Sequence, residues 1–219
     1  MGLISRIAVV SLISGGLFAV DNPALSPIQD DPALPRVLLV GDSISIGYTL
    51  PVRELLKGVA NVHRPPVNCA SSGRGLKEID NWLGNGHWDV IHFNFGLHDA
   101  LPTGQERLIR AKKYQDNIRA ILMRLEQTGA KVIWASTTPL PSSVMIRDGK
   151  PIHYEEDIVA YNAAALAVME EKHVAIDDLH AYALPRLKEL QIPGDMHFTP
   201  EGYRRLAEQV AGSIRWALP

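Results

Sequence analysis

Four short polar clusters hold the side chains that could do chemistry in this 219-residue chain. They are Gly41-Asp42-Ser43, the loop from Asn68 to Gly73, Gly96 to Asp99, and Asp195-Met196-His197. A serine hydroxyl is a weak nucleophile unless a neighbouring base takes its proton. Histidine is a suitable base, and a carboxylate on its other nitrogen orients it and stabilises its charged form. We therefore predict that Ser43 is a nucleophile, His197 its general base and Asp195 the orienting acid.

Attack on a substrate carbonyl also requires hydrogen-bond donors for the negative charge that develops on its oxygen. The backbone amides of Ser43 and Gly73 are two candidates, and the side chain of His98 is a third. Residues beside turns commonly bond backbone amides and so support loops of this kind. Three residues are expected to support the site in this way: Asp42, Asn68 and Asp99.

Each assignment has a plainer structural alternative. Ser43 could cap the helix that follows it, His197 could be an ordinary loop histidine, and His98 could be a structural hydrogen-bonding residue. His92 lies on a predicted strand and is expected in the core. Together with His98 and Asp99 it matches no common metal-ligand spacing, so no metal site is predicted.

Alternating strands and helices must position these clusters. Short apolar runs that end at turn residues predict buried strands, and these cover residues 37–43, 59–64, 88–95, 132–135 and 174–176. Helices are expected from Pro51, with Thr49 as cap, and over 76–83, 106–127, 158–171, 181–190 and 200 onward, with Thr199 as cap. The order predicts an α/β fold, a three-layer αβα arrangement with a doubly wound, flavodoxin-like parallel sheet of about five strands. Ligands bind at the carboxyl ends of such strands, where the four clusters could meet.

The segment from 137 to 157 is long for a loop inside a compact domain, and such loops are usually functional. It contains three prolines, at positions 139, 141 and 151. We expect this loop to shape the substrate site, with Arg147, His153 and Tyr154 as candidate contacts.

Composition excludes several classes of protein. Hydrophobic residues make up 46% and charged residues 21%, as in folded soluble proteins. The net charge of -2 gives no electrostatic reason to expect nucleic acid or an anionic membrane as a partner. The single cysteine, Cys69, allows no intramolecular disulfide and no thiolate zinc cluster. The sequence leaves the oligomeric state open.

The N-terminal residues differ in composition from the rest. Arg6 is the only charge among residues 1–20, and the apolar stretch behind it resembles the core of a secretory signal peptide. The alternative is an uncleaved N-terminal anchor. We predict a signal peptide over 1–20, a proline-rich linker over 21–35 and a catalytic domain over 36–219, and hence export to the periplasm or the exterior.

The four clusters, in this order and at these places, resemble the sequence blocks of the SGNH hydrolases, also called GDSL esterases and lipases. Ser43 matches the nucleophile of the first block, and Gly73 the glycine whose amide contributes to the oxyanion hole. Gly96 to Asp99 resembles the third block, and Asp195 to His197 the fifth. The resemblance covers roughly residues 36 to 215 and implies an ester hydrolase that needs no metal or organic cofactor.

Two positions depart from the family pattern. His98 stands where the family usually has asparagine, and a neutral imidazole can also donate a hydrogen bond. The usual Asp-x-x-His spacing places Gly194, and not Asp195, at the position of the acid. Residues two apart in extended backbone point the same way, so Asp195 could still reach His197. A backbone carbonyl that orients the histidine, as in some relatives, is the alternative.

The expected substrate is a small ester, and export together with the resemblance favours a carbohydrate O-acetyl ester. A lysophospholipase or thioesterase of the same family is the nearer alternative. A non-catalytic binding domain on the same fold is another, suggested by the two departures. A flavodoxin-like nucleotide binder is disfavoured because the chain has no glycine-rich phosphate loop beside Gly41.

Overall fold

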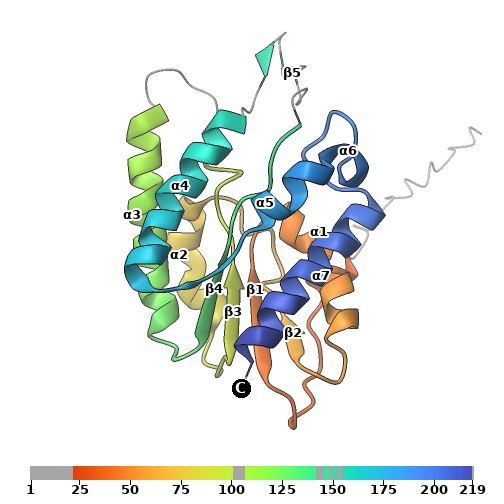
Figure 1. Ribbon diagram of the computed structural model, residues 1–219. Coiled ribbons are helices and arrows are strands. Elements are labelled where there is room, and N and C mark those ends of the chain that lie inside the picture. The colour runs from red at the N-terminus through yellow and green to blue at the C-terminus, as the bar shows by residue number, and fades with distance from the viewer. Residues whose placement is uncertain (1–21, 101–106, 142–145, 148–149, 152–154, 219) are drawn as a thin grey trace, which may run out of the picture.

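The computed structural model describes residues 22–100, 107–141, 146–147, 150–151 and 155–218. Five parallel strands form its central sheet in the order β2-β1-β3-β4-β7 (Figure 1). The strands are β1 (Arg36–Val40), β2 (Asn61–His63), β3 (Val90–Phe93), β4 (Lys131–Ala135) and β7 (Ala175–Asp177). Because the chain runs outward from β1 to β2 and then returns to β3 on the other side, the sheet is doubly wound. The predicted α/β fold with about five parallel strands is therefore confirmed.

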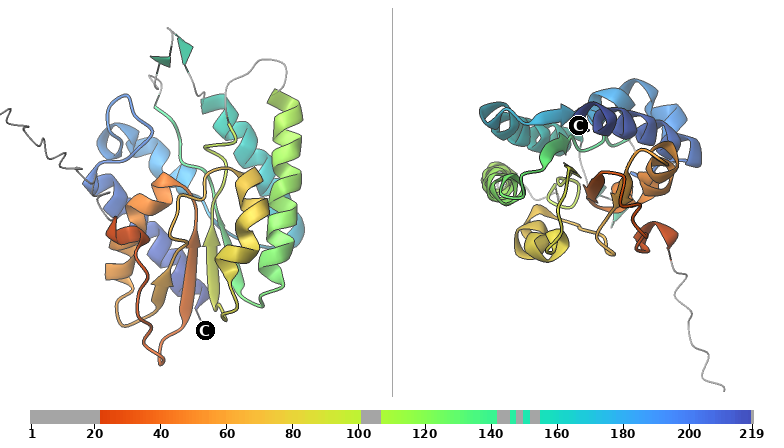
Figure 2. Two further views of the ribbon diagram at one scale, coloured as in Figure 1. Left: turned by 180° about the vertical axis from the view of Figure 1, so that it is seen from behind. Right: turned by 90° about the horizontal axis from the view of Figure 1, so that it is seen from below.

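Helices cover the sheet in two groups (Figures 1 and 2). One group pairs α1 (Ser43–Leu55) with α7 (Pro200–Ala217), and the other packs α3 (Arg107–Glu126) between α2 (Ser72–Leu83) and α4 (Glu155–Lys172). Shorter elements lie outside these groups: η1 (Pro23–Leu25), β5 (Ile146–Arg147), β6 (Lys150–Pro151), α5 (Leu179–Ala183), η3 (Leu184–Arg186) and α6 (Leu187–Leu190).

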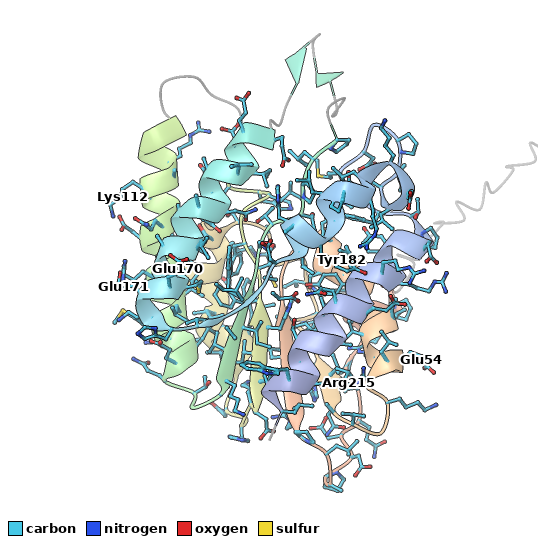
Figure 3. The ribbon with its side chains drawn as sticks, viewed as in Figure 1. Glu54, Lys112, Glu170, Glu171, Tyr182 and Arg215 are labelled. Carbon is cyan, nitrogen blue, oxygen red and sulfur yellow. The ribbon has the colours of Figure 1, made fainter. Side chains whose placement is uncertain are left out.

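The sheet is buried on both faces because each connection between its consecutive strands contains a helix. Val37, Leu39 and Val40 on β1 and Val90 and Ile91 on β3 are completely buried. Such continuous apolar strands are typical of a parallel sheet between helical layers. Charged side chains lie on the outer helix faces, as Figure 3 shows for the labelled residues Glu54, Lys112, Glu170 and Glu171.

The predicted start of the first helix is wrong. The helix begins at Ser43, and the Asp42 carboxylate caps it by accepting the Ile44 amide at 2.9 Å. Thr49 does not cap; its buried hydroxyl donates to the Ser45 carbonyl inside the helix, and Pro51 lies within the helix. Asp42 fixes the start of the helix, and the buried side chains of Tyr48 and Val52 on either side of Pro51 hold the helix through the proline.

The helix expected over 181–190 is interrupted. It divides into α5, the 3-10 turn η3 and α6, with Pro185 at the start of η3. Proline has no amide hydrogen for the α-helical ladder, which explains why a single helix does not continue through this position.

The described part of the expected linker, residues 22–35, lies against the domain. The Asn61 side chain donates to the Asp31 and Leu34 carbonyls and accepts the Asp31 amide at 2.9 Å. Arg53 on α1 bonds the carbonyls of Pro23 and Ser26. The domain boundaries stay a prediction, but these contacts attach residues 22–35 to α1 and β2.

The predicted signal peptide lies outside the described residues, so export stays a prediction. No helix within the described ranges is long and apolar enough to cross a membrane.

Gly202 lets the start of α7 approach the chain before it. A Cβ at this position would overlap the Leu190 carbonyl oxygen. We expect Gly202→Ala to lower the free energy of unfolding by about 1–3 kcal/mol, because backbone atoms cannot move aside cheaply. Urea denaturation measures this change.

Gly212 on the same helix provides the matched control. It is exposed, and no described atom lies within 4 Å of its added Cβ. Gly212→Ala should raise the free energy of unfolding by about 0.4–1 kcal/mol, since alanine reduces the entropy of the unfolded chain. Equal unfolding midpoints for the two variants would contradict this account of α7.

Candidate active site

Ser43 is the first residue of α1 and lies just beyond the carboxyl end of β1. Its side chain is half-buried, and Asp42, not Ser43, provides the helix cap. The turn before it is tight, because a Cβ at Gly41 would lie 2.7 Å from the Ser45 Cβ. The capping alternative for Ser43 therefore does not describe this structure, and the hydroxyl is available to another partner.

That partner is His197. Its Nε2 lies 2.9 Å from the Ser43 Oγ, although 154 positions separate the two residues. The Thr199 side chain caps α7 by accepting the Gly202 amide. This cap fixes the start of α7, and His197 lies two residues before Thr199. The structure thus brings together the side chains predicted as nucleophile and base.

Asp195 contacts the other nitrogen of His197. Its Oδ1 lies 2.7 Å from Nδ1 and also accepts the His197 backbone amide at 2.9 Å. The hydrogen bond from the His197 amide is the main cause that lowers the pKa of Asp195 below its ordinary 3.8. Gly194, at the usual position of the family's acid, has φ of +74°, a turn conformation that favours glycine. Asp195 occupies the orienting position despite the shorter spacing.

The two backbone amides predicted for the oxyanion hole lie in the first turns of two helices. Ser43 is the first residue of α1 and Gly73 the second residue of α2. Amides in a first turn have no acceptor within their own helix, and the helix dipole makes that end favourable for negative charge. The space beside Gly73 is open, since an added Cβ would have the Ser71 Oγ at 3.8 Å as its only described neighbour.

Asp99 fixes the start of α2. Its carboxylate accepts the Ser72 amide at 2.9 Å and the Ser72 hydroxyl at 2.6 Å. Burial raises the pKa of Asp99, and the Ser72 bonds oppose that rise. The Asn117 side chain on α3 donates to the same hydroxyl. Asp99 therefore holds the residue next to Gly73, which is a supporting position.

His98 lies beside Asp42 and is partly exposed. Its Nε2 is 4.0 Å from the Asp42 Oδ2, and 41% of its side chain is exposed. Asp42 is buried, and this burial raises the pKa of its carboxyl, while His98 is the largest influence that lowers it. The contribution of His98 to an oxyanion hole stays a prediction.

Asn68 stabilises the loop before α2. Its side-chain oxygen accepts the Ala70 amide at 2.9 Å, and Ala70 has φ of +54°, in the left-handed region. Non-glycine residues adopt this conformation only where neighbouring contacts hold them there. The Arg74 side chain on α2 also donates to the Asn68 carbonyl.

Of the other residues considered from the sequence, His92 does not join this site. His92 is completely buried, and its Nε2 lies 2.9 Å from Asp177 in the core. The described residues hold no group of three or more side chains suited to a metal ion. The loop candidates Arg147, His153 and Tyr154 lie outside the described side chains.

Sequence reasoning missed two residues at the site. Ser72 connects Asp99 to the start of α2, and Arg64 is a buried cation directly after β2. Arg64 had one detectable signal, because a charged residue at the carboxyl end of a strand lies at the ligand-binding edge of the sheet. The contact of Ser72 depends on neighbouring loops and leaves no periodic pattern.

Fold and site together define a serine hydrolase with a Ser-His-Asp arrangement. Comparisons with known proteins agree: the chain matches the model of the GDSL-like lipase/acylhydrolase family over residues 39–205. The protein therefore belongs to this family of SGNH esterases and is a carboxylic ester hydrolase. No curated protein matches the chain.

Solved structures share the fold at low sequence identity. An acetyl xylan esterase is 17% identical with a TM-score of 0.66, covering 82% of this chain and 99% of its own. A lipase/acylhydrolase from Enterococcus faecalis is 22% identical with a TM-score of 0.67, covering 84% and 97%. A GDSL-like lipase from Bacteroides thetaiotaomicron is 19% identical with a TM-score of 0.64, covering 92% and 97%.

The contact between Asp195 and His197 predicts a loss of activity when the carboxylate is removed. Asp195→Asn should lower kcat/KM by roughly 10-fold to 100-fold, less than for a fully buried triad acid. Because the pKa of Asp195 is lowered, its ionised form is favoured in the folded protein and is lost only as pH falls below 3.8. The loss should therefore be present at about pH 7, where the wild-type carboxylate is ionised.

The exposed Asp116 on α3 offers a control carboxylate, and Asp116→Asn should leave kcat/KM unchanged. An Asp195→Asn protein with wild-type kcat/KM would mean that another group orients His197.

Proposed function

We propose that the protein hydrolyses a small ester through an acyl-enzyme on Ser43, and that its substrate is a carbohydrate O-acetyl ester. One observation carries the mechanism: Ser43, His197 and Asp195 form a hydrogen-bonded chain with contacts of 2.9 and 2.7 Å. A serine within hydrogen-bond reach of a base that is itself oriented by an acid is the arrangement of an activated nucleophile.

Acylation begins when the Ser43 hydroxyl attacks the ester carbonyl while its proton passes to the His197 Nε2. The Asp195 carboxylate accepts the Nδ1 hydrogen bond and stabilises the imidazolium that forms. The negative charge on the carbonyl oxygen is bound by the Ser43 and Gly73 amides, with His98 as a third donor. Each such donor contributes about 3 kcal/mol to transition-state stabilisation.

Acylation then ends with loss of the alcohol, and deacylation repeats the same proton transfers with water. The imidazolium of His197 gives its proton to the departing alcohol, which breaks the ester bond and leaves the acyl group on Ser43. A water molecule then gives a proton to His197 and attacks the acyl carbon. The carboxylic acid leaves as Ser43 recovers its proton. The steps use only side chains and backbone of this chain.

A polar groove beside the proposed oxyanion hole supports a carbohydrate as the alcohol part. It has a volume of about 360 Å³, and Gly73 and His98 are among its lining residues. Its other polar lining residues include Arg110, Lys113, Asn117 and Tyr161. Amides, hydroxyls and cations offer many hydrogen-bond partners to the hydroxyl groups of a sugar. The predicted export and the likeness to an acetyl xylan esterase agree with this proposal.

A second candidate is a lysophospholipase or thioesterase that accepts a long acyl chain. A larger groove of about 900 Å³ favours it, because Leu140, Leu184, Leu187 and Ile192 contribute to its lining. Gly194, the neighbour of Asp195, also borders this groove. An acyl chain bound here would have its carbonyl on the side of the proposed triad.

The central test compares the wild-type protein with Ser43→Ala on a panel of acetylated sugars. The wild type should release acetate, and Ser43→Ala should lower kcat by at least about 10,000-fold, because no other group can form the acyl-enzyme. Liberated acetate measures turnover, and the thermal midpoint checks that the variant is folded. Undiminished turnover by Ser43→Ala would remove Ser43 from the mechanism.

Chain-length preference separates the two candidate substrates. The carbohydrate esterase should have a higher kcat/KM for p-nitrophenyl acetate than for p-nitrophenyl octanoate, because acetate is the acyl group of the proposed substrate. A preference for octanoate, which Ile192→Asp abolishes, would assign the larger groove of about 900 Å³ to an acyl chain and favour the second candidate.

A further inference from the structure

Arg64 is a buried cation behind the proposed nucleophile. It directly follows β2, and only 8% of the residue is exposed. Among the described residues, no carboxylate lies within ion-pair distance of its guanidinium. Burial is the main cause that lowers the pKa of Arg64, but the pKa of a guanidinium is high enough that the group stays charged at neutral pH.

On one side the guanidinium bonds the turn that carries Ser43. Its Nη2 donates to the Gly41 carbonyl at 3.1 Å, two residues before Ser43. Its Nη1 donates to the hydroxyls of Ser45 at 3.1 Å and Thr49 at 3.0 Å. Arg64 therefore holds both the turn after β1 and the first turns of α1.

On the other side the guanidinium bonds the loop that leads to Gly73. Its Nε donates to the Pro65 carbonyl and its Nη2 to the Val67 carbonyl, each at 3.3 Å. The Cys69 amide of the same loop donates to the Gly41 carbonyl at 3.2 Å. A guanidinium has five N–H donors in a rigid plane, and the five contacts of Arg64 account for that number. One planar group thus connects two separate loops.

These two loops carry the two amides that must bind a single oxygen atom. We propose that Arg64 is a positioning residue that holds the Ser43 and Gly73 amides in the geometry of one oxyanion hole. The proposal rests on the proposed ester hydrolase function. Stability alone does not explain a buried cation bonded to neutral acceptors, because desolvation of the charge opposes folding.

Lysine keeps the charge but has neither the planar shape nor the five donors of arginine. Arg64→Lys should therefore loosen one loop against the other. A small misplacement of catalytic groups lowers the rate by up to about 100-fold, so we expect a loss of between about 10-fold and 100-fold in kcat. KM for p-nitrophenyl acetate should change by less than about 3-fold, because substrate binding in the ground state does not use the oxyanion geometry.

The experiment must separate positioning from simple loss of folded protein. A fluorophosphonate reagent first titrates the reactive serines to completion, and kcat for p-nitrophenyl acetate is then expressed per titrated site. A positioning role lowers kcat per site, whereas a merely structural role lowers the number of sites and leaves kcat per site unchanged. The inhibition constant of phenylboronic acid, which forms a tetrahedral adduct, should rise by the same factor as kcat/KM falls.

Arg53 provides a matched control. It lies on α1 and also donates to backbone carbonyls, those of Val62, Pro23 and Ser26, but none of these belongs to the two loops. Arg53→Lys, measured under the same conditions, should leave kcat per site unchanged even where it lowers the thermal midpoint.

A second variant tests the proposal if Arg64→Lys does not fold. Thr49→Val removes one acceptor from the guanidinium while Arg64 stays in place, and kcat per site should fall by at least about 3-fold. Wild-type protein that is neither labelled nor active would defeat the proposed function. If the wild type is active and Arg64→Lys has an unchanged kcat per site, the role of Arg64 is overturned while the proposed function stands. The same holds for Thr49→Val where that variant replaces Arg64→Lys.

Discussion

The contact between the Ser43 hydroxyl and the His197 imidazole is the constraint on which the site depends. The two residues are 154 positions apart, so only the fold can bring them within 2.9 Å. Ser43 begins α1 and His197 precedes α7, and these helices pack against each other on one side of the sheet (Figure 2). Gly47 makes that packing close, because a Cβ there would overlap the ring of Tyr203 on α7. The chemistry of the site thus rests on helix packing as well as on the strands.

The second constraint is the arrangement of the loops that supply the backbone amides. Asp42 caps α1 by accepting the Ile44 amide, and the Ser43 amide lies at the start of that helix. Asp99 accepts hydrogen bonds from the Ser72 amide and hydroxyl at the start of α2. Asp42 is buried and Asp99 is partly buried, and burial raises the pKa of each carboxyl. Arg64 lies between the two loops and bonds both. Buried polar groups with complete hydrogen bonding favour one geometry over others, which a preorganised oxyanion hole requires.

Much of this arrangement could be predicted from the sequence. The strand of residues 36–40 and the clusters at strand ends follow from apolar runs and turn residues, and the topology of a parallel sheet brings those ends to one edge. The start of α1 does not follow from the sequence, because Pro51 is typical of a helix boundary and the Asp42 cap depends on side-chain geometry. The contacts of Arg64 and Ser72 join loops that are distant in sequence, and no local pattern encodes them. Asp195 reaches His197 at the shorter spacing because Gly194 adopts a turn conformation.

The most direct measurement is the location of a fluorophosphonate adduct by peptide mass spectrometry, made on the wild type and on His197→Ala. The account predicts a single adduct on Ser43 in the folded wild type. It also predicts that His197→Ala slows the labelling rate by at least about 100-fold, because the hydroxyl loses the base that activates it. An adduct on another residue, or labelling of Ser43 at the same rate in both proteins, would contradict the account.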